Sequence, residues 1–267
     1  MRKDCRLSFA FSGGRFAARP MNYIFPVLAA LVAPVAVAAD VPKAIAFLPQ
    51  DAFVKGAITV VVPPPDLDKY VAKVEASAAK DPEWFKEHAK KAAPGVPLPY
   101  DEKIGLTKAE YDEYLKLWDS REFKAVEAVI LQLKQGSDKK WAITAAVGGG
   151  QEGGGSLPIS TLKYDSDKDV FVSPNGTLKR LEDVKADKRS ILGEWNGSEW
   201  RYEEETSLGK TKENFAIGKT GDGKFGLIVY RMQEISSEGT RLYDKSLVVR
   251  FPMGEAGILK PEAPANR

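Results

Sequence analysis

Residues 215–232, FAIGKTGDGKFGLIVYRM, carry the signal that decides the fold. Asp222-Gly223 stands between two segments rich in strand-forming residues, and the Asp-Gly pair favours the tight turns of β-hairpins. In the second segment, Phe225, Leu227 and Val229 alternate with other residues, which places them on one face of a strand. The stretch therefore predicts an antiparallel β-hairpin.

The same two-residue period recurs through the second half of the chain, from about Lys124 onward. Apolar side chains alternate at Trp141, Ile143, Ala145 and Val147. Turn signals occur at Ser166 to Lys168, Asn175-Gly176, Asn196-Gly197 and Gly221 to Gly223. The last strand is expected at Leu242 to Phe251. We expect residues 123–252 to form an antiparallel β domain, a sheet or partial β-barrel or sandwich of about seven to nine strands. Residues 253–267, rich in Pro, Gly and Ala, are expected to be a flexible tail.

Residues 39–122 are expected to form a mainly helical N-terminal region, after a short strand at Ala57 to Val62. Asp66 and Asp81-Pro82 mark the starts of two helices. A third helix has a capping box at Thr107 and Glu110 and an aromatic stripe at Tyr111, Tyr114, Leu115 and Trp118. A proline-rich strap at residues 94–99 is extended. These features predict an α+β fold in which the N-terminal helices pack on the antiparallel sheet.

The start of the chain has the pattern of an export signal. An uncharged run from Tyr23 ends at Ala36-Val37-Ala38, which fits the rule for signal-peptidase cleavage. Pro26 and Pro34 interrupt the run, which is shorter than the roughly 20 apolar residues of a transmembrane helix. Residues 1–38 are therefore expected to be a leader and signal peptide that is removed. The mature protein is expected to be soluble, without a stable membrane span, and periplasmic or secreted.

Composition limits the function classes. Removal of a leader with five basic residues and one acidic residue leaves 229 residues with a net charge of −2. Nucleic-acid binding needs a clustered positive surface, and this near-neutral chain gives no sign of one. Cys5, the only cysteine, lies in the leader. The mature chain is therefore expected to lack disulfides, thiolate metal sites and cysteine nucleophiles.

The metal-like and cofactor-like patterns in the chain are incomplete. Asp165, Asp167 and Asp169 resemble the start of a calcium-binding loop, but Val170 and Gly176 stand where an EF-hand needs Gly and Glu. An acidic hairpin turn is the favoured interpretation. The glycine-rich residues 148–155 lack the lysine of a phosphate-binding loop. His88 is the only histidine, and it is expected to cover Trp84 and Phe85. We expect no metal and no cofactor.

Aromatic side chains and one carboxylate on the predicted strands suggest a ligand-binding surface. In a strand, Glu204 shares a face with Trp200 and Tyr202, an arrangement that suits a sugar-binding acceptor or a glycosidase acid. A solvated strand face is the favoured interpretation. The candidate ligand-binding residues are Trp141, Trp195, Trp200, Tyr202 and Glu204.

No catalytic motif occurs in the chain, so no catalytic residue is assigned. We expect a non-catalytic module of the cell envelope or secreted fraction that binds a small ligand or another exported protein. The alternative is a secreted carboxylate-dependent hydrolase, acting on carbohydrate, with its carboxylates among Glu203, Glu205 and Asp165. Two carboxylates that meet in a deep cleft would favour the hydrolase.

Overall fold

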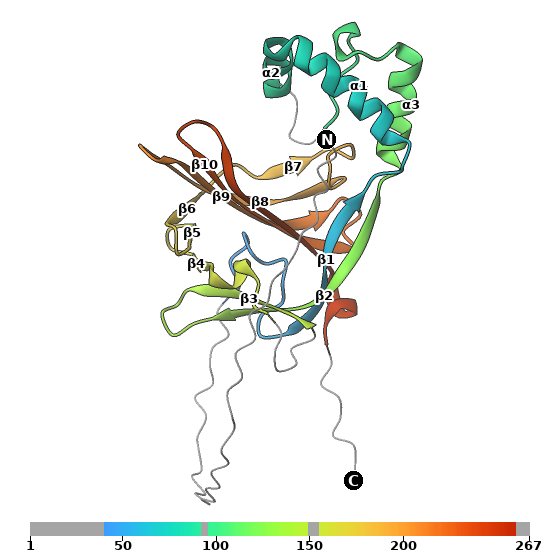
Figure 1. Ribbon diagram of the computed structural model, residues 1–267. Coiled ribbons are helices and arrows are strands. Elements are labelled where there is room, and N and C mark those ends of the chain that lie inside the picture. The colour runs from blue at the N-terminus through green and yellow to red at the C-terminus, as the bar shows by residue number, and fades with distance from the viewer. Residues whose placement is uncertain (1–39, 92–95, 149–154, 260–267) are drawn as a thin grey trace, which may run out of the picture. The chain divides into compact units, whose positions relative to one another are not determined.

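The computed structural model describes residues 40–91, 96–148 and 155–259. The expected leader and most of the glycine-rich segment lie outside the described residues. Eleven antiparallel strands and three α-helices make up most of the described chain (Figure 1). The predicted α+β class with an antiparallel sheet is therefore confirmed.

The strands form a single sheet that closes on itself. Their order is β6-β5-β4-β3-β2-β1-β11-β10-β9-β8-β7, and β6 also pairs with β8. This pairing closes ten of the strands into a ring, and β7 is an additional strand on β8. The bounds are β1 Phe53–Val62, β2 Glu122–Gln135, β3 Trp141–Val147, β4 Lys163–Asp165, β5 Val170–Val172, β6 Thr177–Arg180, β7 Val184–Ala186, β8 Trp195–Thr206, β9 Gly209–Thr220, β10 Phe225–Ser236 and β11 Arg241–Pro252.

The expected number of seven to nine strands is wrong, since the sheet has eleven, and strands of three or four residues are difficult to count from a sequence. β4, β5 and β7 contain three residues each and β6 contains four. Strands of this length present one or two inward side chains, which does not establish alternation. The ring also includes β1, which lies between β2 and β11, so the helices are inserted between two neighbouring strands.

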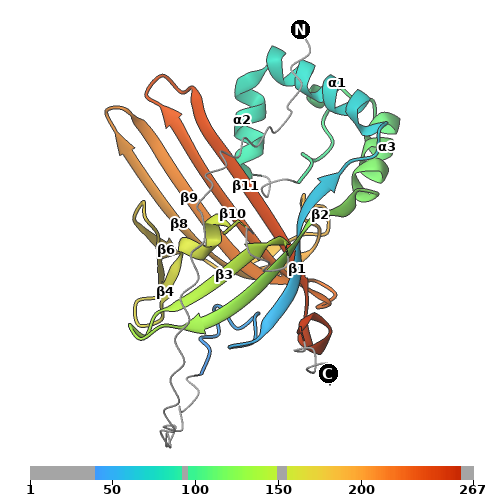
Figure 2. The same cartoon turned by 60° about the horizontal axis from the view of Figure 1, so that its bottom comes forward.

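The hairpin that decides the fold is present and longer than its sequence signal. β9 and β10 pair from Gly226 opposite Lys219 to Ser236 opposite Gly209, and Gly223 adopts a positive φ of 68° in the turn between them. This hairpin and the β10–β11 hairpin are visible as long ribbons in Figure 2. The predicted last strand is also confirmed, as β11. After it, Ile258 forms a bridge with Val54, so the chain stays bonded to β1 beyond the last strand.

The turn predicted at Asn196-Gly197 is wrong, since both residues lie inside β8. Gly197 pairs with Gly218 of β9, and a Cβ atom at Gly197 would lie 2.2 Å from the carbonyl oxygen of Ile217. Glycine at this position allows the close approach of two strand backbones. Asn-Gly occurs more often in a turn, and the sequence alone does not distinguish a turn from a close pairing of two strands.

The three helices are α1 (Leu67–Lys80), α2 (Pro82–Lys91) and α3 (Lys108–Asp119). The predicted capping box of α3 is confirmed, because Thr107 Oγ1 accepts a hydrogen bond from the Glu110 backbone and the Glu110 side chain accepts one from the Thr107 backbone. Hydrogen bonds from Lys73 and Thr107 lower the pKa of Glu110 to about 2. Asp66 precedes α1, but its side chain makes no capping hydrogen bond.

The helices bury a core of their own. Tyr70 of α1 and Tyr111 of α3 pack with Ile104 and Leu106, and Trp84 and other partly buried side chains surround them. α1 contacts both α2 and α3, which lie beside it in Figure 1. The aromatic stripe of α3 therefore packs on other helices. The expectation that the N-terminal helices pack on a face of the sheet is wrong for this stripe.

Two hydrogen bonds join the end of α3 to the loop that follows β7. Trp118 Nε1 donates to the Arg189 carbonyl oxygen at 2.7 Å, and Arg121 donates to the Ser190 carbonyl oxygen at 2.8 Å. The guanidinium of Arg121 also lies 4.2 Å from the Trp118 ring centre. These partly buried contacts satisfy two backbone carbonyl groups of the loop.

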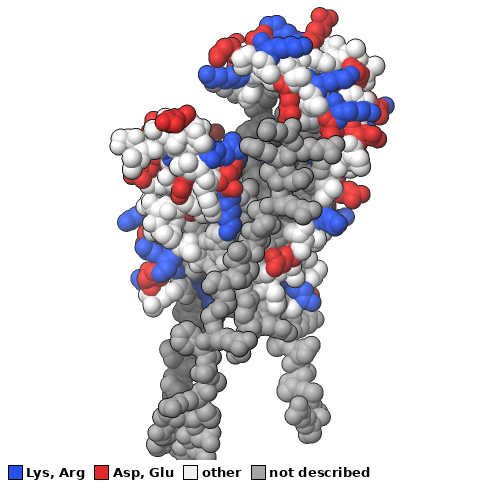
Figure 3. Space-filling view, viewed as in Figure 1, with Lys and Arg blue, Asp and Glu red and all other residues white. Residues whose placement is uncertain are grey.

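The interior of the ring is filled by side chains, with an aromatic cluster at its centre. Trp200 of β8 contacts Tyr164, Phe171 and Phe215, with ring centres 4.8 to 5.9 Å apart. Ile45 and Leu48, from the segment before β1, are also buried. On the face shown in Figure 3, charged side chains of both signs are interspersed.

Candidate functional site

The wall of the ring is irregular where β6 and β7 meet β8. β6 and β7 pair with β8 at successive positions, since Arg180 lies opposite Trp200 and Val184 lies opposite Gly197. Between them the chain leaves the ladder after Leu181, whose N–H donates to the Glu199 carbonyl oxygen at 2.8 Å. Side chains near this break can therefore reach both the interior and the outside.

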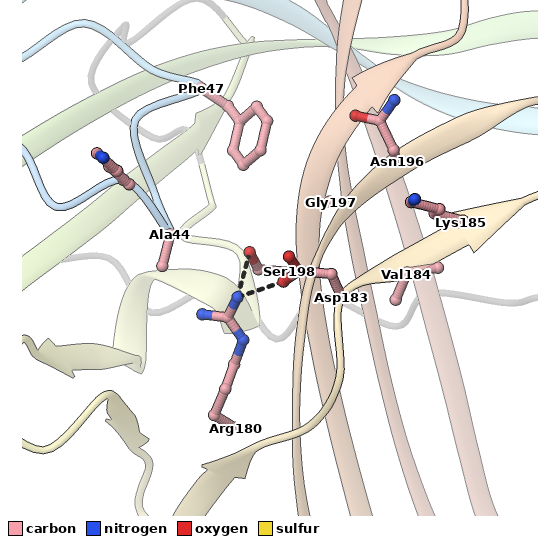
Figure 4. A pocket seen from close by; sticks show the side chains of 10 residues that line it. Ala44, Phe47, Arg180, Asp183, Val184, Lys185, Asn196, Gly197 and Ser198 are labelled. Carbon is pink, nitrogen blue, oxygen red and sulfur yellow. Dashed lines mark hydrogen bonds and ion pairs between the residues drawn. The ribbon is translucent and has the colours of Figure 1, made fainter.

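A cavity of about 320 Å³ lies at this break (Figure 4). Its volume is within the range of small-molecule sites. The segment before β1 forms one side of the cavity and β6, β7 and β8 form the others. The lining residues are Lys43, Ala44, Phe47, Arg180, Asp183, Val184, Lys185, Asn196, Gly197 and Ser198.

Arg180 is the central polar group of the cavity. Its Nη2 donates to Asp183 Oδ1 at 2.5 Å and to Ser198 Oγ at 2.9 Å, as the dashed lines in Figure 4 show. Its Nη1 donates to both carboxylate oxygens of Asp169 at 3.3 Å. The guanidinium also lies 4.7 Å from the Trp200 ring centre. Packing and hydrogen bonds thus fix the cation at the edge of the aromatic cluster.

Asp169 is the second carboxylate partner of Arg180. It accepts hydrogen bonds from the Tyr164 hydroxyl at 2.8 Å and from Trp200 Nε1 at 3.3 Å. Burial and the hydrogen bond to Asp169 raise the pKa of Tyr164, so Tyr164 stays a neutral donor. Asp169 has a φ of 50° in the β4–β5 turn, a conformation that Asp tolerates better than most residues. The predicted acidic hairpin turn is therefore confirmed.

The cavity has an excess of positive charge. Lys43 and Lys185 are exposed and Arg180 is partly buried, while Asp183 is the one acidic side chain among the lining residues. Ala44, Phe47 and Val184 add apolar surface, and Figure 4 shows Phe47 and Lys185 on opposite sides of the cavity. The cavity can therefore accommodate an acidic group beside an apolar one.

The structure brings only some of the predicted ligand-binding residues together. Trp141 and Trp200 are both buried in the interior, and Tyr164 pairs with Trp141 in register and contacts the Trp200 ring. Trp195 lies on the opposite face of β8 from Trp200 and packs with Ala216 and Leu227. Trp200 does not line the cavity, and it contacts Arg180, which does.

Tyr202 and Glu204 lie further along β8, where the strand is more exposed. The Tyr202 hydroxyl donates to Glu204 Oε2 at 2.7 Å, and this hydrogen bond raises the pKa of Tyr202. Tyr202 also packs closely on Gly176, where an added Cβ atom would lie 2.5 Å from the tyrosine ring. Neither residue lines the cavity.

Glu213 is a buried carboxylate, 1% exposed, that is not among the residues predicted from the sequence. Its oxygens accept hydrogen bonds from Ser173 Oγ at 2.7 Å, Asn175 Nδ2 at 3.0 Å and the Tyr230 hydroxyl at 3.0 Å. Burial and the nearby Glu213 raise the pKa of Tyr230. The signal for this position is the alternation of Glu213 with Phe215 and Ile217, which gives the three side chains the same inward face.

The carboxylates considered for hydrolysis are not gathered in the cavity. Glu203 and Glu205 share one exposed face of β8, where both form ion pairs with Lys210. The Glu203–Lys210 contact lowers the pKa of Glu203, which favours its ionised form. His88 Nδ1 hydrogen-bonds the Trp84 carbonyl oxygen at 2.8 Å and its ring stacks on Trp84, in agreement with the expected covering role.

Within residues 40–91, 96–148 and 155–259, no group of three or more His, Cys, Asp or Glu side chains is arranged to hold a metal ion. In the same ranges no helix is long and apolar enough to cross a membrane.

No protein-family model, curated protein or solved structure matches this chain. Function is therefore inferred from the geometry and chemistry of the cavity.

Proposed function

We propose that the chain is an exported, non-catalytic binding protein of the cell envelope or secreted fraction, and that the cavity at Arg180 binds a small anionic ligand. The observation that carries this proposal is the lining of the cavity. Three cationic side chains, Lys43, Arg180 and Lys185, accompany one acidic side chain and an apolar wall. Arg180 supplies directional hydrogen bonds, and the lysines add favourable electrostatic potential.

A small ligand is favoured over a protein partner because the site is a cavity with converging polar groups. Asn196 and Ser198 also line it, so a bound molecule meets a few placed hydrogen-bonding groups within an otherwise mixed surface. Export is supported by the leader, whose apolar run ends at Ala36-Val37-Ala38.

Binding is favoured over hydrolysis because two of the three candidate carboxylates, Glu203 and Glu205, have another partner. Glu203 and Glu205 are paired with Lys210 on an exposed strand face. A two-carboxylate mechanism needs both groups on either side of the bond to be cleaved, and the exposed pair does not border the cavity.

Reversal of one cavity charge should weaken anion binding. We expect benzoate, used as a probe, to bind the purified protein saturably, and Lys185→Glu to raise its dissociation constant about tenfold through loss of attraction and added repulsion. Lys179→Glu is the matched control, because Lys179 is exposed on β6 and does not line the cavity. Isothermal titration calorimetry measures both dissociation constants.

The control variant should bind benzoate within about twofold of the unmodified protein, since its charge lies outside the cavity. Benzylamine, a cation of similar shape, should bind no variant measurably. Absence of benzoate binding, or equal weakening by Lys185→Glu and Lys179→Glu, would contradict the proposed site.

A further inference from the structure

Arg180 carries two carboxylate partners that differ in how firmly they are held. Asp169 accepts hydrogen bonds from Tyr164 and Trp200 as well as from Arg180. Asp183, within the described residues, hydrogen-bonds Arg180 alone, and its side chain is 70% exposed. Asp169, whose side chain is 47% exposed, thus accepts from three donors, while Asp183 depends on a single contact.

Asp183 occupies the position on Arg180 that an incoming acidic group would need. Both Nη2 contacts of Arg180, to Asp183 and to Ser198, are with groups that line the cavity. Its Nη1 is directed to Asp169, and its Nε is buried without a partner in the described part of the chain. Ser198 is buried and Asp183 is exposed, so Asp183 is the partner that a ligand reaching Nη2 from the cavity would replace.

We infer that Asp183 is an internal competitor that mimics the ligand, and that the ligand's acidic group is a carboxylate which displaces it from Arg180. This inference rests on the proposed function of the cavity. The side chain seen on Nη2 is itself a carboxylate, so the site accepts this group with a short hydrogen bond. Asp183 lies three residues from Arg180 in the chain, so its effective concentration is high.

Competition of this kind lowers the apparent affinity without changing the contacts of the bound ligand. The observed dissociation constant is the intrinsic one divided by the fraction of molecules in which Arg180 is free. If Asp183 occupies Arg180 in about nine tenths of the molecules, its removal tightens binding about tenfold. Other contacts of the ligand, with Lys185 and the apolar wall, are unaffected.

Titration of Asp183 variants with benzoate tests the inference. We expect Asp183→Asn, which removes the charge, and Asp183→Ala, which removes the acceptor, to bind benzoate about tenfold more tightly than the unmodified protein. Glu182→Gln is the control, because Glu182 is the neighbouring exposed acid and does not line the cavity. Its affinity should stay within about twofold of the unmodified value.

The outcomes separate the inference from the proposed function. If Lys185→Glu weakens benzoate binding while both Asp183 variants bind no more tightly than the unmodified protein, the cavity is a binding site and the competitor role is wrong. If benzoate binds neither the unmodified protein nor the Asp183 variants, the proposed function is wrong as well. Equal tightening by Glu182→Gln and Asp183→Asn would show a general charge effect and would overturn the specific role of Asp183.

Discussion

Trp200→Ala should lower the free energy of unfolding by about 3 to 5 kcal/mol, the range for removal of a large buried aromatic side chain. Trp200 is 0% exposed and contacts three other aromatic rings, so its loss leaves a cavity that rigid strands fill poorly. It also removes the indole donor to Asp169. Chemical denaturation followed by circular dichroism measures the change.

Tyr243→Ala is the control for this prediction. Tyr243 lies near the exposed end of β11 and is 41% exposed, so its replacement should cost less than about 1 kcal/mol. Equal unfolding midpoints for Trp200→Ala and the unmodified protein would show that the aromatic cluster is not the core of the ring.

Glu213→Ala should lower the free energy of unfolding by about 3 kcal/mol. The substitution leaves Ser173 Oγ, Asn175 Nδ2 and the Tyr230 hydroxyl without their acceptor, and an unsatisfied buried donor costs about 1 to 3 kcal/mol. Glu213→Gln retains one acceptor oxygen and should cost less than Glu213→Ala. Denaturant unfolding of both variants gives the two values.

Glu205→Ala provides the comparison with an exposed carboxylate. The Glu205 side chain is 77% exposed and lies 3.6 Å from Lys210, and such surface pairs contribute about 0 to 1 kcal/mol. If Glu213→Ala costs no more than Glu205→Ala, the hydrogen bonds to Glu213 do not stabilise the fold.

The elements predicted correctly are those specified by neighbouring residues. The capping box of α3 and the Asp222-Gly223 hairpin each depend on contacts within one short segment. Closure of the sheet depends instead on β6 and β8, whose paired residues lie about 20 positions apart, and on strands too short to show alternation. The insertion of the helices between β1 and β2 is likewise a long-range feature.

The cavity could be predicted only in part. The sequence predicts Trp200 as a ligand-binding residue, and it does lie against Arg180, but its own surface is buried. Arg180 follows Leu178 with a spacing of two, which gives it an inward position once β6 is known to be a strand. The approach of Lys43 and Phe47 to β8 cannot be read from local patterns because it depends on how the segment before β1 packs into the ring.

The most direct test of the proposed site is a benzoate titration followed by the indole N–H signals in NMR spectra. The chain has five tryptophans, and the Trp200 indole donates to Asp169 beneath Arg180. Trp84 and Trp118, in the helical region, serve as internal controls. Saturable movement of the Trp200 signal, with the Trp84 and Trp118 signals unchanged, is the predicted result. An unmoved Trp200 signal, or equal movement of all the indole signals, would contradict binding at Arg180.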